Sequence, residues 1–74
     1  MGSRAIEQLR EFAHICTEMA HYMQMEEEFL RTMYFAGIRG HEIKQEWKDG
    51  QRRSAAHVAD YRDQYRKMKK ELYL

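Results

Sequence analysis

The sequence predicts an all-α protein: an antiparallel helical hairpin that dimerises into a four-helix bundle. Three observations predict this fold class. The 74 residues include no proline and only four glycines, so the turn residues that many short strands require are missing. Apolar residues recur at alternating spacings of three and four in both halves of the chain, as in amphipathic helices. One core of this size seldom contributes more than about 3–5 kcal/mol, so self-association is expected to add stability.

The first helix is expected over about residues 4–36. Neither glycine nor proline interrupts residues 6–35, and Ser3 is placed to cap the start. Gly37 can adopt the left-handed conformation that ends a helix, so a turn is expected at 37–40. The apolar positions of this arm form one lattice, with a single polar residue among them: Leu9, Phe12, Cys16, Met19, Met23, Glu26, Leu30 and Met33.

The second helix is expected over about residues 41–73, with a lattice of the same spacing. Asp49-Gly50 is a turn signal inside it, which leaves open a kink or short break near Gly50. Because the lattice keeps its phase across this glycine, the whole chain, 1–74, is expected to be a single helical domain. The lattice consists of Ile43, Trp47, Gln51, Ser54, Val58, Tyr61, Tyr65, Met68 and Leu72.

The two lattices also predict the register of the hairpin. Two antiparallel helices that meet at a turn near 38–39 pair residues whose numbers sum to about 77. In that register Phe12 meets Tyr65, and Glu26, the polar residue of the first lattice, meets Gln51. Two arginines next to Gln51 are expected to neutralise the glutamates, giving a layer that specifies register rather than an acid-base site. This expected polar layer consists of Glu26, Gln51, Arg52 and Arg53.

A third apolar column on the first arm predicts a contact beyond the hairpin. Its residues are seven apart and are expected beside the column that faces the second arm. Leaving this column in water would forfeit about 5–9 kcal/mol, comparable to the whole stability of a small domain. A second copy of the chain is the expected cover, and a different protein is the alternative. The expected self-association or partner face consists of Ile15, Tyr22, Phe29, Ala55 and Ala59.

Groups that could carry chemistry are few. Glu11 with His14, and Glu18 with His21, repeat the spacing of di-iron bundles, but the lattice places both histidines away from the seam. A zinc clip between His21 and His57 is a weaker alternative. The single cysteine excludes an intrachain disulfide framework, and no nucleophile triad or phosphate-binding loop can be read. We therefore expect no catalytic residue, no metal, no cofactor and no enzymatic activity.

Charge is divided unevenly between the arms. Residues 1–38 hold three basic and six acidic side chains, and residues 39–74 hold ten and six, so charges of −3 and +4 sum to the net +1. Five cations of the second arm fall on one stripe roughly 30 Å long, suited to a phosphate backbone or an acidic partner. An ordinary solvated face is the plainer interpretation. We call this set the basic stripe: Lys48, Arg52, Arg62, Arg66 and Lys69.

The sequence therefore predicts a non-enzymatic protein–protein interaction module, a small self-associating regulator, adaptor or inhibitor that occupies a partner's surface. The alternative is a small nucleic-acid-binding regulator that uses the basic stripe. The expected partners are a second copy of the chain and an unidentified protein. No apolar run approaches the roughly 18 residues of a membrane span and no signal-peptide pattern is present, so a cytoplasmic location without membrane contact is expected.

Overall fold

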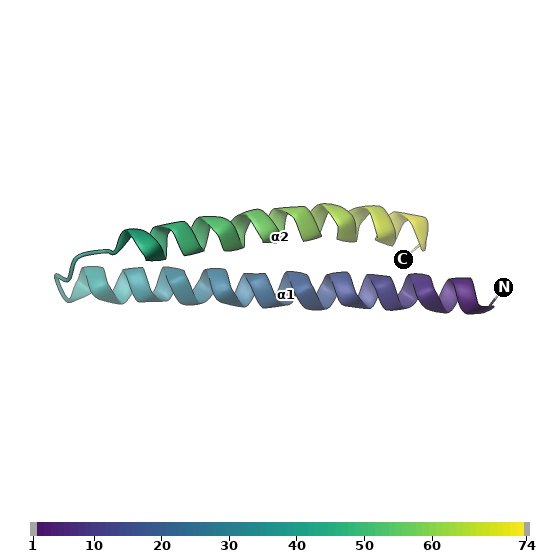
Figure 1. Cartoon of the computed structure of the whole chain (residues 1–74), viewed down its shortest axis with the longest axis horizontal. Coiled ribbons are helices and arrows are strands. Elements are labelled where there is room, and N and C mark those ends of the chain that lie inside the picture. The colour runs from purple at the N-terminus through teal and green to yellow at the C-terminus, as the bar shows by residue number, and fades with distance from the viewer. Residues whose placement is uncertain (1, 74) are drawn as a thin grey trace.

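The computed structural model is a hairpin of two long antiparallel helices (Figure 1). It describes residues 2–73, so the first and last positions of the expected domain lie outside the described residues. Helix α1 spans Gly2–Ile38 and helix α2 spans Gln45–Glu71. Residues 2–73 contain no strand, and the molecule measures 59 × 18 × 14 Å. The predicted all-α hairpin is thus confirmed as a rod that is one layer thick and two helices wide.

The end of α1 differs from the expected turn, because a different glycine ends the helix. The helix continues through Gly37 to Ile38, and Gly40 has the positive φ, 71°. The N–H of His41 donates to the carbonyl of Ala36 at 2.8 Å, and the N–H of Gly40 donates to the carbonyl of Gly37 at 3.1 Å. These two hydrogen bonds form a Schellman C-cap with Gly40 in the left-handed position.

The starts of both helices also differ from the expected boundaries. Helix α1 already includes Gly2, so Ser3 lies inside its first turn instead of capping it. Helix α2 begins at Gln45, four residues later than expected, after Lys44, whose side chain makes no capping hydrogen bond. The Nζ atom of Lys44 lies 5.4 Å from the centre of the Trp47 ring, which is a cation–π distance.

Helix α2 is continuous through Gly50, so the break that stayed open is absent from it. Gly50 is buried under the ring of Phe29. A Cβ at this position would lie 2.6 Å and 2.7 Å from the Cε1 and Cε2 carbons of that ring. The glycine therefore marks a close approach of the two helices, and the Asp49-Gly50 turn signal is wrong.

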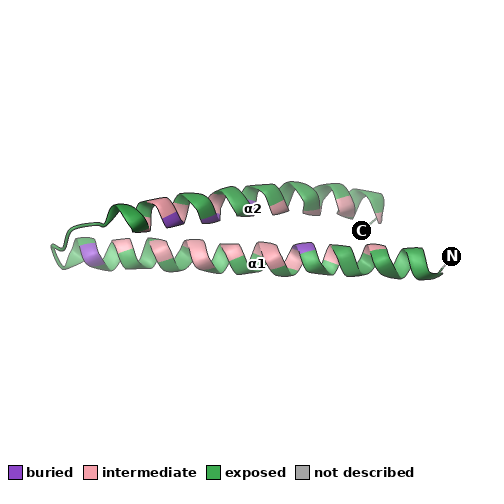
Figure 2. Ribbon diagram, viewed as in Figure 1, coloured by how far each residue is buried: buried purple, intermediate pink, exposed green. Residues whose placement is uncertain are grey.

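The core is a single seam between the helices. Figure 2 shows the buried and half-buried residues along the facing sides of α1 and α2, with the outer sides exposed. Within the described residues, the buried apolar side chains are those of Ile15, Ala36 and Val58. Two helices enclose little volume, so many large apolar side chains remain in contact with water.

The predicted register is confirmed by two contacts across the seam. The rings of Phe12 and Tyr65 stack with their centroids 5.3 Å apart. The Nε2 atom of Gln51 donates a hydrogen bond to Oε2 of Glu26 at 3.1 Å. Both pairs have residue numbers that sum to 77, the value that the turn position predicts.

The column of Ile15, Tyr22 and Phe29 lies within this seam and not beside it. Ile15 is only 3% exposed, and Tyr22 stacks on His57 with the ring centroids 4.3 Å apart. The prediction that this column lies outside the seam, free to contact a second copy, is therefore wrong. The reason is geometric: α2 covers two adjacent columns of α1, this one and the column that contains Phe12.

Candidate interaction surfaces

The observed seam leaves a different apolar column of α1 uncovered. Leu9, Met23 and Leu30 are 52%, 48% and 48% exposed, and Cys16 in the same column is half-buried. Two further apolar residues, each about half exposed or more, extend this face at its two ends. We call this surface the α1 strip, which consists of Ile6, Leu9, Cys16, Met23, Leu30 and Tyr34.

The α1 strip runs along most of α1. From its first to its last residue it spans about 42 Å at 1.5 Å per residue. Between its large side chains lie Ala13 and Ala20, both exposed, and Glu27, whose carboxylate pairs with Arg31 at 2.9 Å. An apolar band of this length, although interrupted at Glu27, is unusual on a monomeric protein and is typical of a contact with another macromolecule.

The apolar lattice of the first arm predicted that four residues of the α1 strip lie in the seam, namely Leu9, Cys16, Met23 and Leu30. Spacing alone does not show which two of three neighbouring apolar columns a partner helix covers. Side-chain size is the sequence feature that favours the columns of α1 that α2 actually covers. Bulky Tyr22 and Phe29 pack beside two small residues of α2, Gly50 and Ser54, which are both buried.

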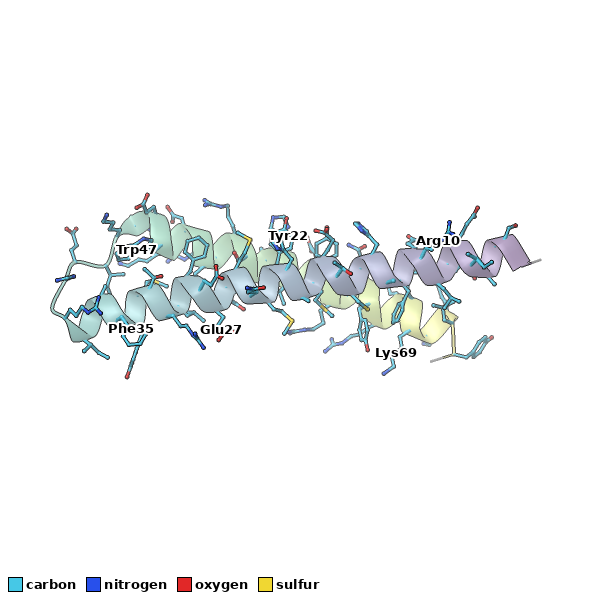
Figure 3. The ribbon with its side chains drawn as sticks, turned by 90° about the horizontal axis from the view of Figure 1, so that it is seen from below. Arg10, Tyr22, Glu27, Phe35, Trp47 and Lys69 are labelled. Carbon is cyan, nitrogen blue, oxygen red and sulfur yellow. The ribbon has the colours of Figure 1, made fainter. Side chains whose placement is uncertain are left out.

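The basic stripe lies on the same side of the hairpin as the α1 strip. Figure 3 shows Lys69 and Glu27, which neighbours the strip, along one long edge of the hairpin, and Tyr22 and Trp47 along the other. All five stripe residues are exposed, and the two ion pairs of the described chain involve none of them. The Nζ atom of Lys69 lies 5.9 Å from the centre of the Tyr65 ring. One side of the molecule thus combines an apolar band on α1 with a cationic band on α2.

Two alanines that were expected in the self-association face lie between the cations of the stripe. Ala55 is half-buried at the border of the seam, and Ala59 is exposed. Their small side chains leave the surface between the cations smooth. Contact of these alanines with a second copy stays a prediction.

The hairpin also carries a groove near the turn. A hollow of about 360 Å³ is lined in part by Phe35, His41 and Trp47. A second hollow, of about 220 Å³, adjoins it and adds Met25 and Phe29. The larger hollow is open and has both polar and apolar lining, and the smaller one is mainly apolar, so the groove resembles a shallow contact surface more than an enclosed substrate site.

The expected polar layer is only partly formed. Glu26 and Gln51, both half-buried, meet as predicted. Arg52 and Arg53 are exposed, and neither takes part in an ion pair within residues 2–73. Because each residue turns the helix by about 100°, the two positions after Gln51 point away from the seam. The layer is therefore a two-residue hydrogen bond, without the expected arginine compensation.

The histidines considered for metal binding surround Tyr22 instead. Its ring lies 5.1 Å from the ring of His21 and 4.3 Å from that of His57, and it also stacks on Tyr61 at 5.9 Å. His14 is exposed on the outer side of α1. Nowhere in the described part of the chain do three metal-ligating side chains gather.

Comparison with protein-family models, with curated proteins and with solved structures finds no match to this chain. Neither described helix has an apolar stretch that is long enough to cross a lipid bilayer. The α1 strip and the basic stripe are therefore the two features from which a function can be argued.

Proposed function

We propose that this chain is a non-enzymatic protein–protein interaction module, a small self-associating helical regulator, adaptor or inhibitor that occupies a partner's surface. Its assembled form is a four-helix arrangement of two hairpins. The observation that carries the proposal is the α1 strip, an apolar band about 42 Å long that α2 leaves uncovered.

The energetics of the hairpin support a partner for this strip. Burying a Leu or Met side chain completely stabilises a protein by about 1.5–3 kcal/mol, so half-exposed side chains would gain about 1 kcal/mol each on being covered. Leu9, Met23 and Leu30 together would then gain about 3 kcal/mol, comparable to the whole stability expected of one small core. Binding of a macromolecular partner to the strip would therefore also stabilise the folded hairpin.

A triple substitution tests the proposal. Leu9→Gln, Met23→Gln and Leu30→Gln together remove the apolar character of the strip, and the hairpin itself should keep its helix content because these side chains are about half exposed. We expect this variant to lose self-association in sedimentation velocity runs and to lose the proteins that the immobilised wild type retains from an extract of its native host.

The matched control replaces three exposed apolar residues outside the strip. Phe35, Ile38 and Ile43, near the turn, are 50%, 64% and 37% exposed, so changing all three to Gln removes a similar apolar surface. This control should keep both kinds of contact. If the two variants behave alike in both assays, the α1 strip has no role in binding and the proposal is wrong.

The second candidate function is binding to nucleic acid through the basic stripe. Its support is that five exposed cations follow one line along α2 and have no partner in the ion pairs of the described residues. A line of cations of this length matches the charge of a phosphate backbone. Fluorescence anisotropy with a labelled duplex tests it, since Arg62→Gln with Arg66→Gln should weaken binding while Lys67→Gln with Lys70→Gln, outside the stripe, should weaken it less.

A further inference from the structure

We propose that the occupant of the α1 strip is a second copy of this chain, bound antiparallel with a two-fold axis at Ala20. This inference rests on the proposed function, and it names the partner and the register of the contact. The two α1 helices would lie strip against strip, and each α2 would keep its place in its own hairpin.

The first support is that the α1 strip is nearly symmetric about Ala20. In an antiparallel pair centred at that residue, positions whose numbers sum to 39 or 40 lie opposite one another. Facing residues of any antiparallel helix pair have numbers with a constant sum. In the seam between α1 and α2 that sum is 77, as the contact of Phe12 with Tyr65 shows. Large side chains of the strip then meet large ones in three pairs, which are Ile6 with Tyr34, Leu9 with Leu30, and Cys16 with Met23.

The second support is the size of the residues at the centre of the strip. Ala20 is exposed and would meet its own counterpart on the axis, whereas Ala13, seven residues away, would meet Glu27. Small side chains at the centre let two helix backbones approach closely, and the larger residues at the ends then close around them. In a two-fold self-contact residue i meets residue j and j meets i, so a strip that reads alike from both ends places large side chains opposite large ones in each half of the contact.

The third support is charge complementarity at the polar residue of the strip. Glu27 pairs with Arg31 of its own helix at 2.9 Å. In the proposed register, Ala13 of the second copy falls opposite Glu27, and Arg10 falls opposite residues 29–30, about 4.5 Å farther along the axis. An arginine side chain is long enough to span that offset, so the carboxylate that interrupts the apolar band would gain a second guanidinium partner in the dimer.

The contact area predicts a weak dimer. A strip about 42 Å long on a helix about 10–12 Å wide covers roughly 450 Å² of each copy, or about 900 Å² in total. Specific interfaces generally bury about 1,000 Å² or more, so this contact lies at the lower limit. We therefore expect dissociation in the micromolar range.

Disulfide trapping tests the register directly. The variant Cys16→Ala with Ala20→Cys carries one thiol, which would face its counterpart across the two-fold axis, within the range of Cα distances that a disulfide spans. We expect oxidation to give a linked dimer of about 18 kDa, twice the chain mass of 9.0 kDa, at least tenfold faster than in the control Cys16→Ala with His21→Cys. His21 is also exposed and adjacent in sequence, but it lies on another face of α1. Equal rates for the two variants would overturn the proposal.

A second variant keeps the test independent of the introduced thiol. Leu9→Gln with Leu30→Gln replaces one facing pair and should raise the dimer Kd at least tenfold in sedimentation equilibrium, with unchanged helix content. A dimer of unchanged affinity overturns the inference. A chain that stays monomeric but binds a host protein through the strip also overturns it and removes self-association from the proposed function, yet leaves the binding of a partner protein standing. If the substitutions in the strip change neither self-association nor the binding of a host protein, both this inference and the proposed function are wrong.

Discussion

The hydrogen bond between Gln51 and Glu26 places a polar pair among seam positions that are mainly apolar. Such a half-buried pair contributes little net stability, because removing both groups from water offsets most of the gain from the bond. Its effect is on register. If α2 slipped by one heptad, Glu26 would face Val58, which cannot donate a hydrogen bond to a carboxylate, so the pair disfavours the alternative alignment.

We expect the double substitution Glu26→Leu with Gln51→Leu to stabilise the hairpin. Two apolar side chains would replace a partly desolvated polar pair, with an expected gain of about 1–2 kcal/mol. For a chain of this length that gain raises the melting temperature by about 4–8 °C per kcal/mol. Thermal melts followed by circular dichroism measure it. Glu26→Leu alone should melt below the double variant, because it leaves the Gln51 amide without its partner, and a double variant that melts below the wild type contradicts the interpretation.

At the scale of the elements, the separation of the two helices depends on Gly50 beneath Phe29. A Cβ at Gly50 would overlap the ring, since two ring carbons lie only 2.6 Å and 2.7 Å from it. Alanine would favour the helical conformation by about 1 kcal/mol over glycine. Overpacking a close contact costs about 1–3 kcal/mol, so Gly50→Ala should have a net destabilising effect of about 1 kcal/mol in urea denaturation.

The matched control for this substitution is Gly37→Ala. Gly37 is also helical, and a Cβ there meets nothing within 4 Å, so alanine should be neutral or stabilising by up to about 1 kcal/mol. In a Phe29→Ala background the overlap at Gly50 disappears, and Gly50→Ala should then stabilise the hairpin. If Gly50→Ala already stabilises the wild type, the close approach does not limit the packing of α2.

The elements also show what could be predicted from the sequence and what could not. Local spacing predicts two helices, and the position of the turn predicts a register that Glu26 and Gln51 confirm. The rotation of α1 about its own axis was not predictable from spacing, because the columns of Leu9, Phe12 and Ile15 are all apolar apart from Glu26 and a single helix covers two of them. The identity of the exposed strip follows from that rotation, so the candidate site was missed although every residue in it had been assigned to a helix.

At the scale of the whole molecule, the proposed dimer brings like charges together. A two-fold axis perpendicular to the α1 helices places both α2 helices on the same side of the α1 pair. The basic stripe lies on the side of α2 that the strip also faces, so the two stripes would run side by side across the gap between the α2 helices. Residues 39–74 of each copy carry a net charge of +4. Repulsion between these arms therefore opposes the apolar contact of the α1 strips.

Salt should consequently strengthen the dimer and weaken any complex with nucleic acid. Screening shortens the range of the repulsion to about 10 Å at 0.1 M ionic strength, so we expect the dimer Kd to fall several-fold between 25 mM and 300 mM NaCl in sedimentation equilibrium. Arg62→Gln with Arg66→Gln removes part of the repulsion and should flatten this dependence. Duplex binding by five stripe cations would instead lose about 10²–10³-fold in affinity between 50 mM and 200 mM salt. A dimer that dissociates as salt rises would mean that ion pairs, and not the apolar strip, hold the two copies together.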